Sequence, residues 1–278
     1  MRANSHVHHE LTPEEEGLAR DAGQSVVETH RRLSKFLRAG VTLPENDRFV
    51  ARTLAELGGE SCFRGYKVPG SPPFPSHACL SVNECVVHGT AGYYPHPLEA
   101  GDVLKIDIGI LREGWIGDAA WTYVFGEKTE EVERLTQCGK DSIRKGIDKL
   151  RAGNRVLEWS RAVQGHVEEE CGLHLVEGLG GHGYGRELHL PPYIPNAVPT
   201  SKREIVEAET VLEPGMLLAV EPMIAVGTGR IKQKRKQWPI FISDGSQCVH
   251  YEHDVLVTEG EPKVLTEGLE EINDLITA

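Results

Sequence analysis

The stretch KIDIGILREGWIGDAAWTY, residues 105–123, decides the fold of this chain. It contains two runs of strand character joined by a polar turn that includes a glycine. In an antiparallel hairpin, residues eleven apart can return to the same face, so Asp107 and Asp118 would lie close together. Two carboxylates that close repel each other unless a cation lies between them or they share a proton. The alternative is that Asp118 belongs to the turn and Asp107 to an exposed strand end.

The turn and strand before Asp107 have a second copy later in the chain. Residues 99–107 (EAGDVLKID) match residues 213–221 (EPGMLLAVE), with Gly in the third place, then an apolar strand and a final carboxylate. Turns of this kind before strands are common, so a chance match is the alternative. The carboxylate at the same offset favours a duplicated half in which Asp107 and Glu221 are equivalent.

Three other segments carry residues suited to a metal site. The Gly-rich segment GLGGHGYGRELHLPP (residues 178–192) contains His182 and His189, and its glycines would let the backbone approach a ligand closely. Glu221 ends an otherwise apolar strand, and Glu252 lies inside the strand-like segment QCVHYEHDVLVT (residues 247–258). A carboxylate in such surroundings is costly to bury unless it is paired or bound to a metal. Four carboxylates and one imidazole are the ligands of a two-metal centre.

Composition narrows the class of protein. With 278 residues, 39% hydrophobic and 26% charged, the chain can form a packed core. The net charge of −12 argues against a DNA-binding protein, because phosphate affinity depends on Lys and Arg. We see no apolar run long enough for a membrane span and no secretory signal, which predicts a cytoplasmic protein without membrane contact. The six cysteines form no CxxC pair, which disfavours a zinc ribbon or a disulfide scaffold.

Local patterns predict an α+β arrangement. We expect a single domain over residues 1–278, with residues 1–11 as a mobile tail. Loops and short strands are expected over residues 58–98, where Gly and Pro are dense. Helices are predicted over residues 13–39, 46–57, 128–151 and 155–171, and strands over residues 103–110, 115–125, 216–224, 240–243 and 251–258.

The ordered motifs DIG…GD, GHGxGRxLH, EPGMxxxxEPM and YEHDVLVT resemble those of the type I methionine aminopeptidases, which have the pita-bread metallopeptidase fold. The resemblance covers residues 12–266, nearly the whole chain. It implies a curved antiparallel sheet with flanking helices and an internal pseudo-two-fold. Only 30 residues separate Glu221 from Glu252, which leaves no room for the helical subdomain of type II enzymes.

The resemblance also implies the roles of particular residues. Two divalent ions (Mn, Fe, Co or Zn) would be held by Asp107, Asp118, His182, Glu221 and Glu252, with Asp118 and Glu252 bridging both. His189 would face the scissile carbonyl, and Glu221 could accept a proton. The segment VNECVVHGT (residues 82–90) would place His88 beside the substrate. The implied reaction removes an N-terminal methionine from nascent proteins and peptides with a small second residue.

A methionine pocket is implied as well. Its wall would be built by Tyr66, Phe74, Cys79, Leu188 and Trp238, with core packing as the alternative, above all for the neighbouring Cys62. The chain departs from the family's usual residues at Leu188 (usually Phe), Leu190 (usually Glu) and His250 (usually Gln). Apparent insertions near residues 68–72 and between His189 and Glu213 would alter the shape of the pocket.

Two rival functions remain to be weighed. A proline-directed peptidase shares the fold, but those relatives usually carry a further N-terminal domain. A binding module without catalysis is disfavoured because all five ligands and both histidines are present. The basic run RIKQKRK, residues 230–236, is either a solvated hairpin tip or a transient contact to ribosomal RNA.

Overall fold

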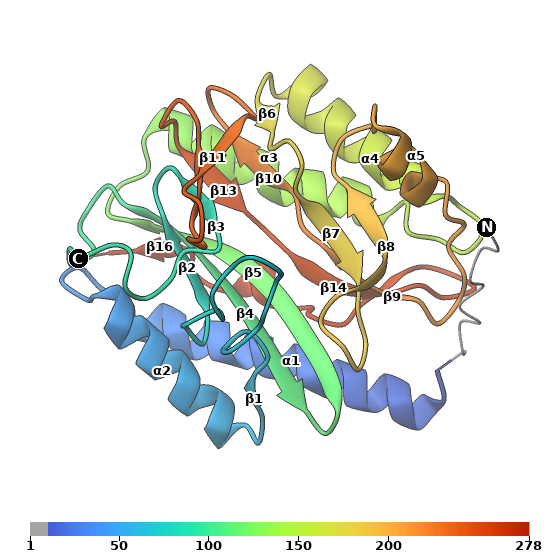
Figure 1. The fold of residues 1–278 in the computed structure, drawn as a ribbon, viewed down its shortest axis with the longest axis horizontal. Coiled ribbons are helices and arrows are strands. Elements are labelled where there is room, and N and C mark those ends of the chain that lie inside the picture. Colours follow the sequence, from blue (N-terminus) through green and yellow to red (C-terminus); the bar gives the residue numbers. More distant parts are fainter. Residues whose placement is uncertain (1–10, 278) are drawn as a thin grey trace.

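In a computed structural model, which describes residues 11–277, helices flank a curved set of antiparallel strands (Figure 1). Helices α1 and α2 lie along one side of the strands, and α3, α4 and α5 lie along the other. The helical elements are α1 (Pro13–Phe36), α2 (Leu43–Glu56), α3 (Glu130–Ile147), α4 (Val156–Gln164), the π-helix η1 (Gly165–Glu170), α5 (Lys202–Ala208) and the 3-10 helix η2 (Leu269–Glu271).

The strands form four hydrogen-bonded sets. The first contains β1 (Glu60–Ser61), β2 (Cys79–Val82), β4 (Val103–Arg112), β5 (Trp115–Phe125) and β16 (Leu275–Ile276). The second contains β15 (Lys263–Val264), β14 (His253–Leu256), β9 (Leu217–Val220), β7 (Gly180–Gly183) and β8 (Leu190–Pro195). Two smaller sets contain β13 (Cys248–His250), β10 (Met223–Ala225) and β6 (His174–Leu175), and β11 (Ile231–Gln233), β12 (Ile240–Ile242) and β3 (Cys85–Val87). All pairings are antiparallel except β16 with β5.

Capping residues set the starts of the first two helices. Thr12 caps α1, accepting a hydrogen bond from the backbone N–H of Glu15, whose carboxylate accepts one from the Thr12 N–H. Thr42 and Glu45 form the same capping box at α2, so this helix begins three residues before its predicted start at residue 46. The predicted end of the first helix was also late, because Leu37 already has extended backbone angles.

The predicted duplication is present as two matching turns. Gly101 and Gly215 both have left-handed backbone angles, with φ of 99° and 91°. In each copy the residue after the glycine donates its N–H to the carbonyl of the initial glutamate, Glu99 or Glu213. The turns then lead into β4 and β9, each paired with an antiparallel partner, β5 or β14. A Gly that tolerates positive φ is what both turns require.

Two predicted strands are interrupted at their acidic residues. The predicted strand over residues 216–224 divides at Glu221-Pro222 into β9 and β10, which join different sheets. Pro222 has no N–H for a ladder, which explains the break. The prediction that Glu252 lies inside a strand was wrong, because Glu252 occupies the gap between β13 and β14. Both glutamates therefore lie where a strand is interrupted, free of regular pairing on both sides.

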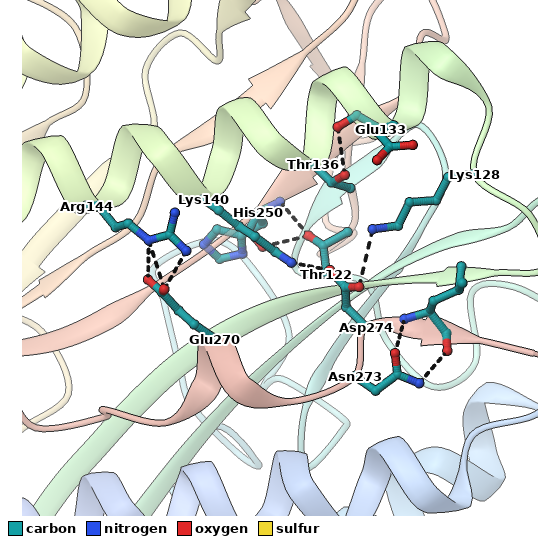
Figure 2. Close-up of polar contacts among 11 residues, drawn as sticks. Thr122, Lys128, Glu133, Thr136, Lys140, Arg144, His250, Glu270, Asn273 and Asp274 are labelled. Atoms are coloured by element: carbon teal, nitrogen blue, oxygen red, sulfur yellow. Dashed lines mark hydrogen bonds and ion pairs between the residues drawn. The ribbon is translucent and has the colours of Figure 1, made fainter.

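Hydrogen bonds join the two halves of the molecule through β5. The Glu252 N–H donates to the carbonyl of Ala120 at 2.9 Å. The Thr122 hydroxyl donates to the carbonyl of His250 at 2.8 Å and accepts from its N–H at 3.1 Å (Figure 2). Figure 2 also shows Asp274, near the end of the chain, held by Lys128 and Lys140. These contacts bring the carboxylates of the two halves together without a continuous ladder.

Several expectations need correction or lie outside the described residues. Helix α5, within the apparent insertion between His189 and Glu213, was not predicted, nor were β7 and β8. The predicted helix over residues 155–171 is α4 followed by the π-turn η1. Residues 1–10 of the predicted tail lie outside the described range. Within residues 11–277, we find no helix with the length and apolarity that crossing a membrane requires.

Candidate metal centre

One cavity of about 360 Å³ brings together every site residue predicted from the sequence. Its walls come from both halves of the fold: β4 and β5 contribute on one side, and β7, the residue after β9 and the residue before β14 contribute on the other. The predicted residues lining it are Tyr66, Phe74, Cys79, His88, Asp107, Asp118, His182, Leu188, His189, Glu221, Trp238 and Glu252. Cys62 does not line it and packs against the backbone of Gly109, in agreement with core packing.

The hairpin of β4 and β5 places the two aspartates on one face. Asp107 is directly opposite Ala120, and Asp118 is opposite Gly109, so the aspartates are diagonal neighbours. The side chain of Asp118 is buried, and its backbone N–H donates to the carboxylate of Asp254 at 2.8 Å. The geometry expected from their eleven-residue spacing is confirmed.

Strand β7 carries His182 to the same cavity, for a reason that differs from the prediction. The glycines beside it do not make room for a ligand. A Cβ atom on Gly181 would lie 2.2 Å from the carbonyl oxygen of Ala219, and one on Gly183 would lie 2.3 Å from that of Pro191. The glycines therefore allow β8 and β9 to approach β7 closely, which holds His182 opposite Ala219, two residues before Glu221.

The carboxylates converge on the imidazole of His182. Its Nε2 lies 4.0 Å from Oδ2 of Asp118 and 4.0 Å from Oε1 of Glu221. Ligand atoms of Asp118, His182 and Glu252 all lie within 4.8 Å of one another, and all three residues are buried. Buried carboxylate and imidazole groups at such separations are a donor set suited to divalent cations.

Burial and mutual repulsion act strongly on these acids. Burial raises the pKa of Asp107 to about 7 and that of Glu221 to about 8. The pKa values of Asp118 and Glu252 are raised well above their usual range, first by burial and then by the neighbouring carboxylates. Burial also lowers the pKa of His182 to about 3, so its imidazole is neutral and its Nε2 is free to act as a ligand.

The residues fit a bound cation. Oδ1 of Asp107 and Oδ1 of Asp118 are buried and have no hydrogen-bond partner among residues 11–277. Buried carboxylate oxygens without a donor are unfavourable, and a positive ion removes both the desolvation penalty and the repulsion between the acids. The Nδ1 of His182 faces the carbonyl of Gly183 at 3.0 Å, which orients Nε2 toward the carboxylates.

Two further histidines border the cluster of carboxylates around His182. His189 lies at the exposed mouth, with its ring centre 4.3 Å from that of His182, and the Tyr66 hydroxyl contacts its Nδ1 at 2.7 Å. His88 follows β3 with a φ of 56°, an uncommon conformation for a residue other than glycine. Burial lowers the pKa of His88 to about 4, so its imidazole is neutral near pH 7.

An aromatic and sulfur-containing slot adjoins these histidines. The ring of Trp238 packs edge-on against Phe74 at 5.2 Å, and Cys79 and Leu188 are buried in the same wall. The indole N–H of Trp238 donates to the carbonyl of Pro72, in the apparent insertion at residues 68–72. Leu190 is exposed and does not line the cavity.

Sequence reasoning missed two residues of the site. Asp254 is fully buried, and its carboxylate accepts a hydrogen bond from the backbone N–H of Asp118. Its acidic side chain, followed by the apolar residues Val255 and Leu256 in β14, was the available signal. His250 was noted only as a departure, yet its Nε2 lies 3.1 Å from Oε2 of Glu221. Val68 and Val87 also line the cavity, from the two segments already expected near the pocket, and Phe63 lines it without any signal that separates it from core residues.

Comparisons with known proteins identify relatives of this chain. The chain is 36% identical to methionine aminopeptidase 1 of Bacillus subtilis, over 92% of this chain and 97% of that protein. It is 36% identical to the methionine aminopeptidase of Clostridium acetobutylicum, over 89% and 94%. The crystal structure of the Thermotoga maritima methionine aminopeptidase superposes with a TM-score of 0.84 at 33% identity, covering 94% of this chain and 99% of that one.

The pita-bread fold itself extends to more distant proteins. The Xaa-Pro dipeptidase from Bacillus anthracis superposes with a TM-score of 0.74 at 21% identity, and the match covers 98% of this chain but 65% of the dipeptidase. Residues 17–259 match the description of metallopeptidase family M24. With its relatives named methionine aminopeptidases at 36% identity, the chain belongs to metallopeptidase family M24.

Proposed function

We propose that this chain is a metal-dependent methionine aminopeptidase that acts as a single catalytic domain. The observation that carries the proposal is the cavity, which joins a cluster of buried carboxylates and one imidazole to an aromatic, sulfur-containing slot. The names of the relatives with 36% identity support it. The expected substrates are peptides and nascent chains with an N-terminal methionine and a small second residue.

Five residues would hold two divalent cations of the Mn, Fe, Co or Zn group: Asp107, Asp118, His182, Glu221 and Glu252. When bound, such ions polarise a peptide carbonyl and make water a stronger nucleophile near neutral pH. Asp118 and Glu252 come from opposite halves of the fold, which suits the bridging role that we assign to them. His182 and Glu221 would complete the site on one side, and Asp107 on the other.

The chain's own groups account for the remaining steps. Glu221 would accept the proton of the attacking water, because its carboxylate faces the cavity. His189, held by the Tyr66 hydroxyl, would stabilise negative charge that develops on the carbonyl oxygen. His88 would hold the substrate amide against the wall that Trp238 forms.

The methionine side chain would enter the slot beside Trp238. Its thioether is unbranched and polarisable, and sulfur–aromatic contacts add to apolar burial. Phe74 and Trp238 offer ring edges there, while Cys79 and Leu188 close the wall. The carboxylate cluster beyond the slot leaves little room for a large second side chain, so Ala, Gly or Ser is expected at that position.

A proline-directed peptidase remains the rival proposal, because the Xaa-Pro dipeptidase shares the fold. The test compares Met-Ala-Ser with Xaa-Pro peptides, using chain reconstituted with each candidate metal. Asp118→Ala and Glu252→Ala should abolish turnover and release metal, whereas Asp148→Ala, at an exposed position away from the cavity, should change neither. Equal or better turnover of Xaa-Pro peptides without methionine would support the rival, and full metal content and turnover in both cluster variants would refute the metal centre.

A further inference from the structure

A second cluster of metal-ligating side chains lies outside the cavity, where α3 packs against η1. Cys138 of α3, His166 of η1 and Cys171 just after η1 place their ligand atoms within 4.8 Å of one another. None of the three lines the cavity already described. Cys138 and His166 are buried, whereas Cys171 is half-buried and gives the cluster access to solvent. Both cysteines carry free thiols.

The π-turn is what brings His166 and Cys171 to the same side. The N–H of Cys171 donates to the carbonyl of His166 at 3.0 Å, a hydrogen bond between residues five apart. In an ordinary α-helix, residues five apart point in clearly different directions, because each residue turns the chain by about 100°. Single π-turns of this kind are rare and occur often at functional sites.

His166 is oriented as a ligand. Its Nε2 lies 3.5 Å from Sγ of Cys171. Zn–S bonds of about 2.3 Å and Zn–N bonds of about 2.0–2.1 Å in a tetrahedron would place sulfur and nitrogen about 3.5 Å apart. On the other side of the ring, Nδ1 faces the carboxylate of Glu170 at 2.8 Å. A histidine that donates Nδ1–H to a carboxylate has its Nε2 lone pair free for a cation.

The charge around the cluster is compatible with a cation. Lys145 lies 2.9 Å from Nδ1 of His166, but its ammonium is also paired with Glu170 at 2.5 Å. The Glu170 carboxylate can therefore compensate the charge of the lysine and accept a proton from Nδ1 of His166. Two thiolates formed in the cluster would have a divalent cation as their balancing charge.

We propose that Cys138, His166 and Cys171 form a zinc site, with the fourth coordination position open to water on the exposed side. Two thiolates and one imidazole are a soft donor set that selects Zn²⁺ over hard cations such as Mg²⁺ or Mn²⁺. The site is distinct in chemistry from the carboxylate centre. It would tie α3 to the end of α4 and η1, and so stabilise the helical layer on that side of the strands.

Binding at this site displaces thiol protons. Burial, followed by the hydrogen-bonded Cys171 thiol, raises the pKa of Cys138, so this thiol is protonated in the metal-free chain. Each cysteine releases its proton as its sulfur–zinc bond forms, and no electron is transferred. Zinc affinity should therefore decrease as the pH is lowered.

The test is a titration of the reduced full chain with Co²⁺, whose thiolate complexes absorb by charge transfer from sulfur. We expect this absorption to reach the amplitude of one thiolate-bound Co²⁺ per chain, to persist in Asp118→Ala, and to disappear in Cys138→Ser and Cys171→Ser. Cys85→Ser, which changes a buried cysteine in β3, should keep it. X-ray absorption of the zinc-loaded chain should show two sulfur neighbours at about 2.3 Å.

A surface variant tests the site without disturbing the core. Glu170→Ala should weaken metal binding by about 10–100-fold, the usual effect of removing a carboxylate that orients a ligating histidine. Glu169→Ala removes the same charge from the neighbouring exposed position and should leave affinity unchanged. Absence of sulfur-to-metal absorption in the reduced wild-type chain would overturn the proposal. So would a Cys138–Cys171 disulfide that forms equally fast with and without excess zinc, since the pair would then be a redox couple.

Discussion

Nε2 of His250 lies 3.1 Å from Oε2 of Glu221, so a residue that departs from the family pattern directly contacts a proposed metal ligand. The backbone of His250 is fixed by the Thr122 hydroxyl, which both donates and accepts there (Figure 2). Burial lowers the pKa of His250 to about 4, so the neutral ring can donate one N–H to the carboxylate. The hydrogen bond orients the Glu221 carboxylate, as the residues that surround metal ligands commonly do.

The first prediction concerns this contact. His250→Ala should weaken metal binding at the carboxylate centre by about 10–100-fold, because Glu221 loses the donor that orients it. His250→Gln restores the residue usual in the family and supplies an amide N–H, so its metal affinity should stay close to that of the wild type. The measurement is peptide turnover against metal concentration. Equal metal dependence in His250→Ala and the wild type would show that the contact has no such role.

A second prediction follows from the close approach of β7 and β9. Gly181→Ala would place a Cβ atom 2.2 Å from the Ala219 carbonyl oxygen, so the strands must separate and His182 must move. We expect a loss of about 1–3 kcal/mol in the free energy of unfolding, together with weaker metal binding. Gly185→Ala, where the nearest atom to a new Cβ is 3.8 Å away, is the matched control. Denaturant unfolding measures the first effect, and no difference between the two variants would contradict the strand-packing role.

These glycines illustrate where sequence patterns stop being informative. The pattern around His182 predicted a site, and His182 does line the cavity, but the pattern could not tell whether a ligand or a neighbouring strand requires the missing side chain. The offset between Asp107 and Asp118 did predict their geometry, because a hairpin relates nearby residues by a simple register. Glu252 meets Ala120 across the two halves, and no local pattern encodes that pairing.

The same distinction applies to the secondary structure. The start of a helix depends on residues close together in the sequence. The capping box of Thr42 and Glu45 could therefore have been recognised, although the predicted helix began later. The interruption of the strand at Pro222 could also have been predicted, since proline has no N–H to donate to a neighbouring strand. The π-turn that joins His166 to Cys171 could not be predicted from the sequence, because its residues fit an α-helix equally well. The two cysteines of that cluster are 33 positions apart in the chain.

The third prediction concerns acid stability and His30. This residue is buried against β5, with Nδ1 3.0 Å from the Tyr123 hydroxyl, and burial lowers its pKa from 6.5 to about 4. Between these values the unfolded chain binds a proton that the folded chain does not. The free energy of unfolding should therefore fall as the pH decreases from 6.5 to 4, with His30 contributing up to about 3 kcal/mol of this loss. Above pH 6.5, His30 causes no pH dependence of the free energy of unfolding.

Urea unfolding at a series of pH values checks this expectation. His30→Gln removes the titrating group and should make the loss of stability between pH 6.5 and 4 shallower. His174→Gln changes an exposed histidine and should leave the slope unchanged. If the free energy of unfolding depends on pH equally in the wild type and His30→Gln, another buried group controls the loss of stability in acid.

The fourth prediction separates the two interpretations of the basic run at residues 230–236. The structure places it on the exposed hairpin of β11 and β12, where Lys234 and Lys236 face solvent. A transient ribosome contact predicts salt-sensitive co-sedimentation that is lost in the combined Lys→Glu variant at positions 232, 234 and 236. The same charge change at exposed Lys35, Lys149 and Lys202 is the control. If the chain does not co-sediment with ribosomes at low salt, the basic run is only a solvated hairpin tip.

The last prediction concerns substrate choice and Leu188, which is buried in the slot wall where the family usually has Phe. Phe74 and Trp238 supply the remaining aromatic edges, so one side of the slot lacks the ring that would grip a thioether. We expect the wild type to discriminate methionine from leucine and norleucine less sharply than its relatives do. Leu188→Phe should restore about 1 kcal/mol of selectivity, the scale of one methylene's fit in an apolar pocket.

The measurement is kcat/KM on Xaa-Ala-Ser peptides for both proteins, with Leu190→Phe, at an exposed position outside the cavity, as the control. Unchanged selectivity in Leu188→Phe would mean that the wall formed by Leu188 does not contact the first side chain, and would remove this residue from the proposed methionine slot.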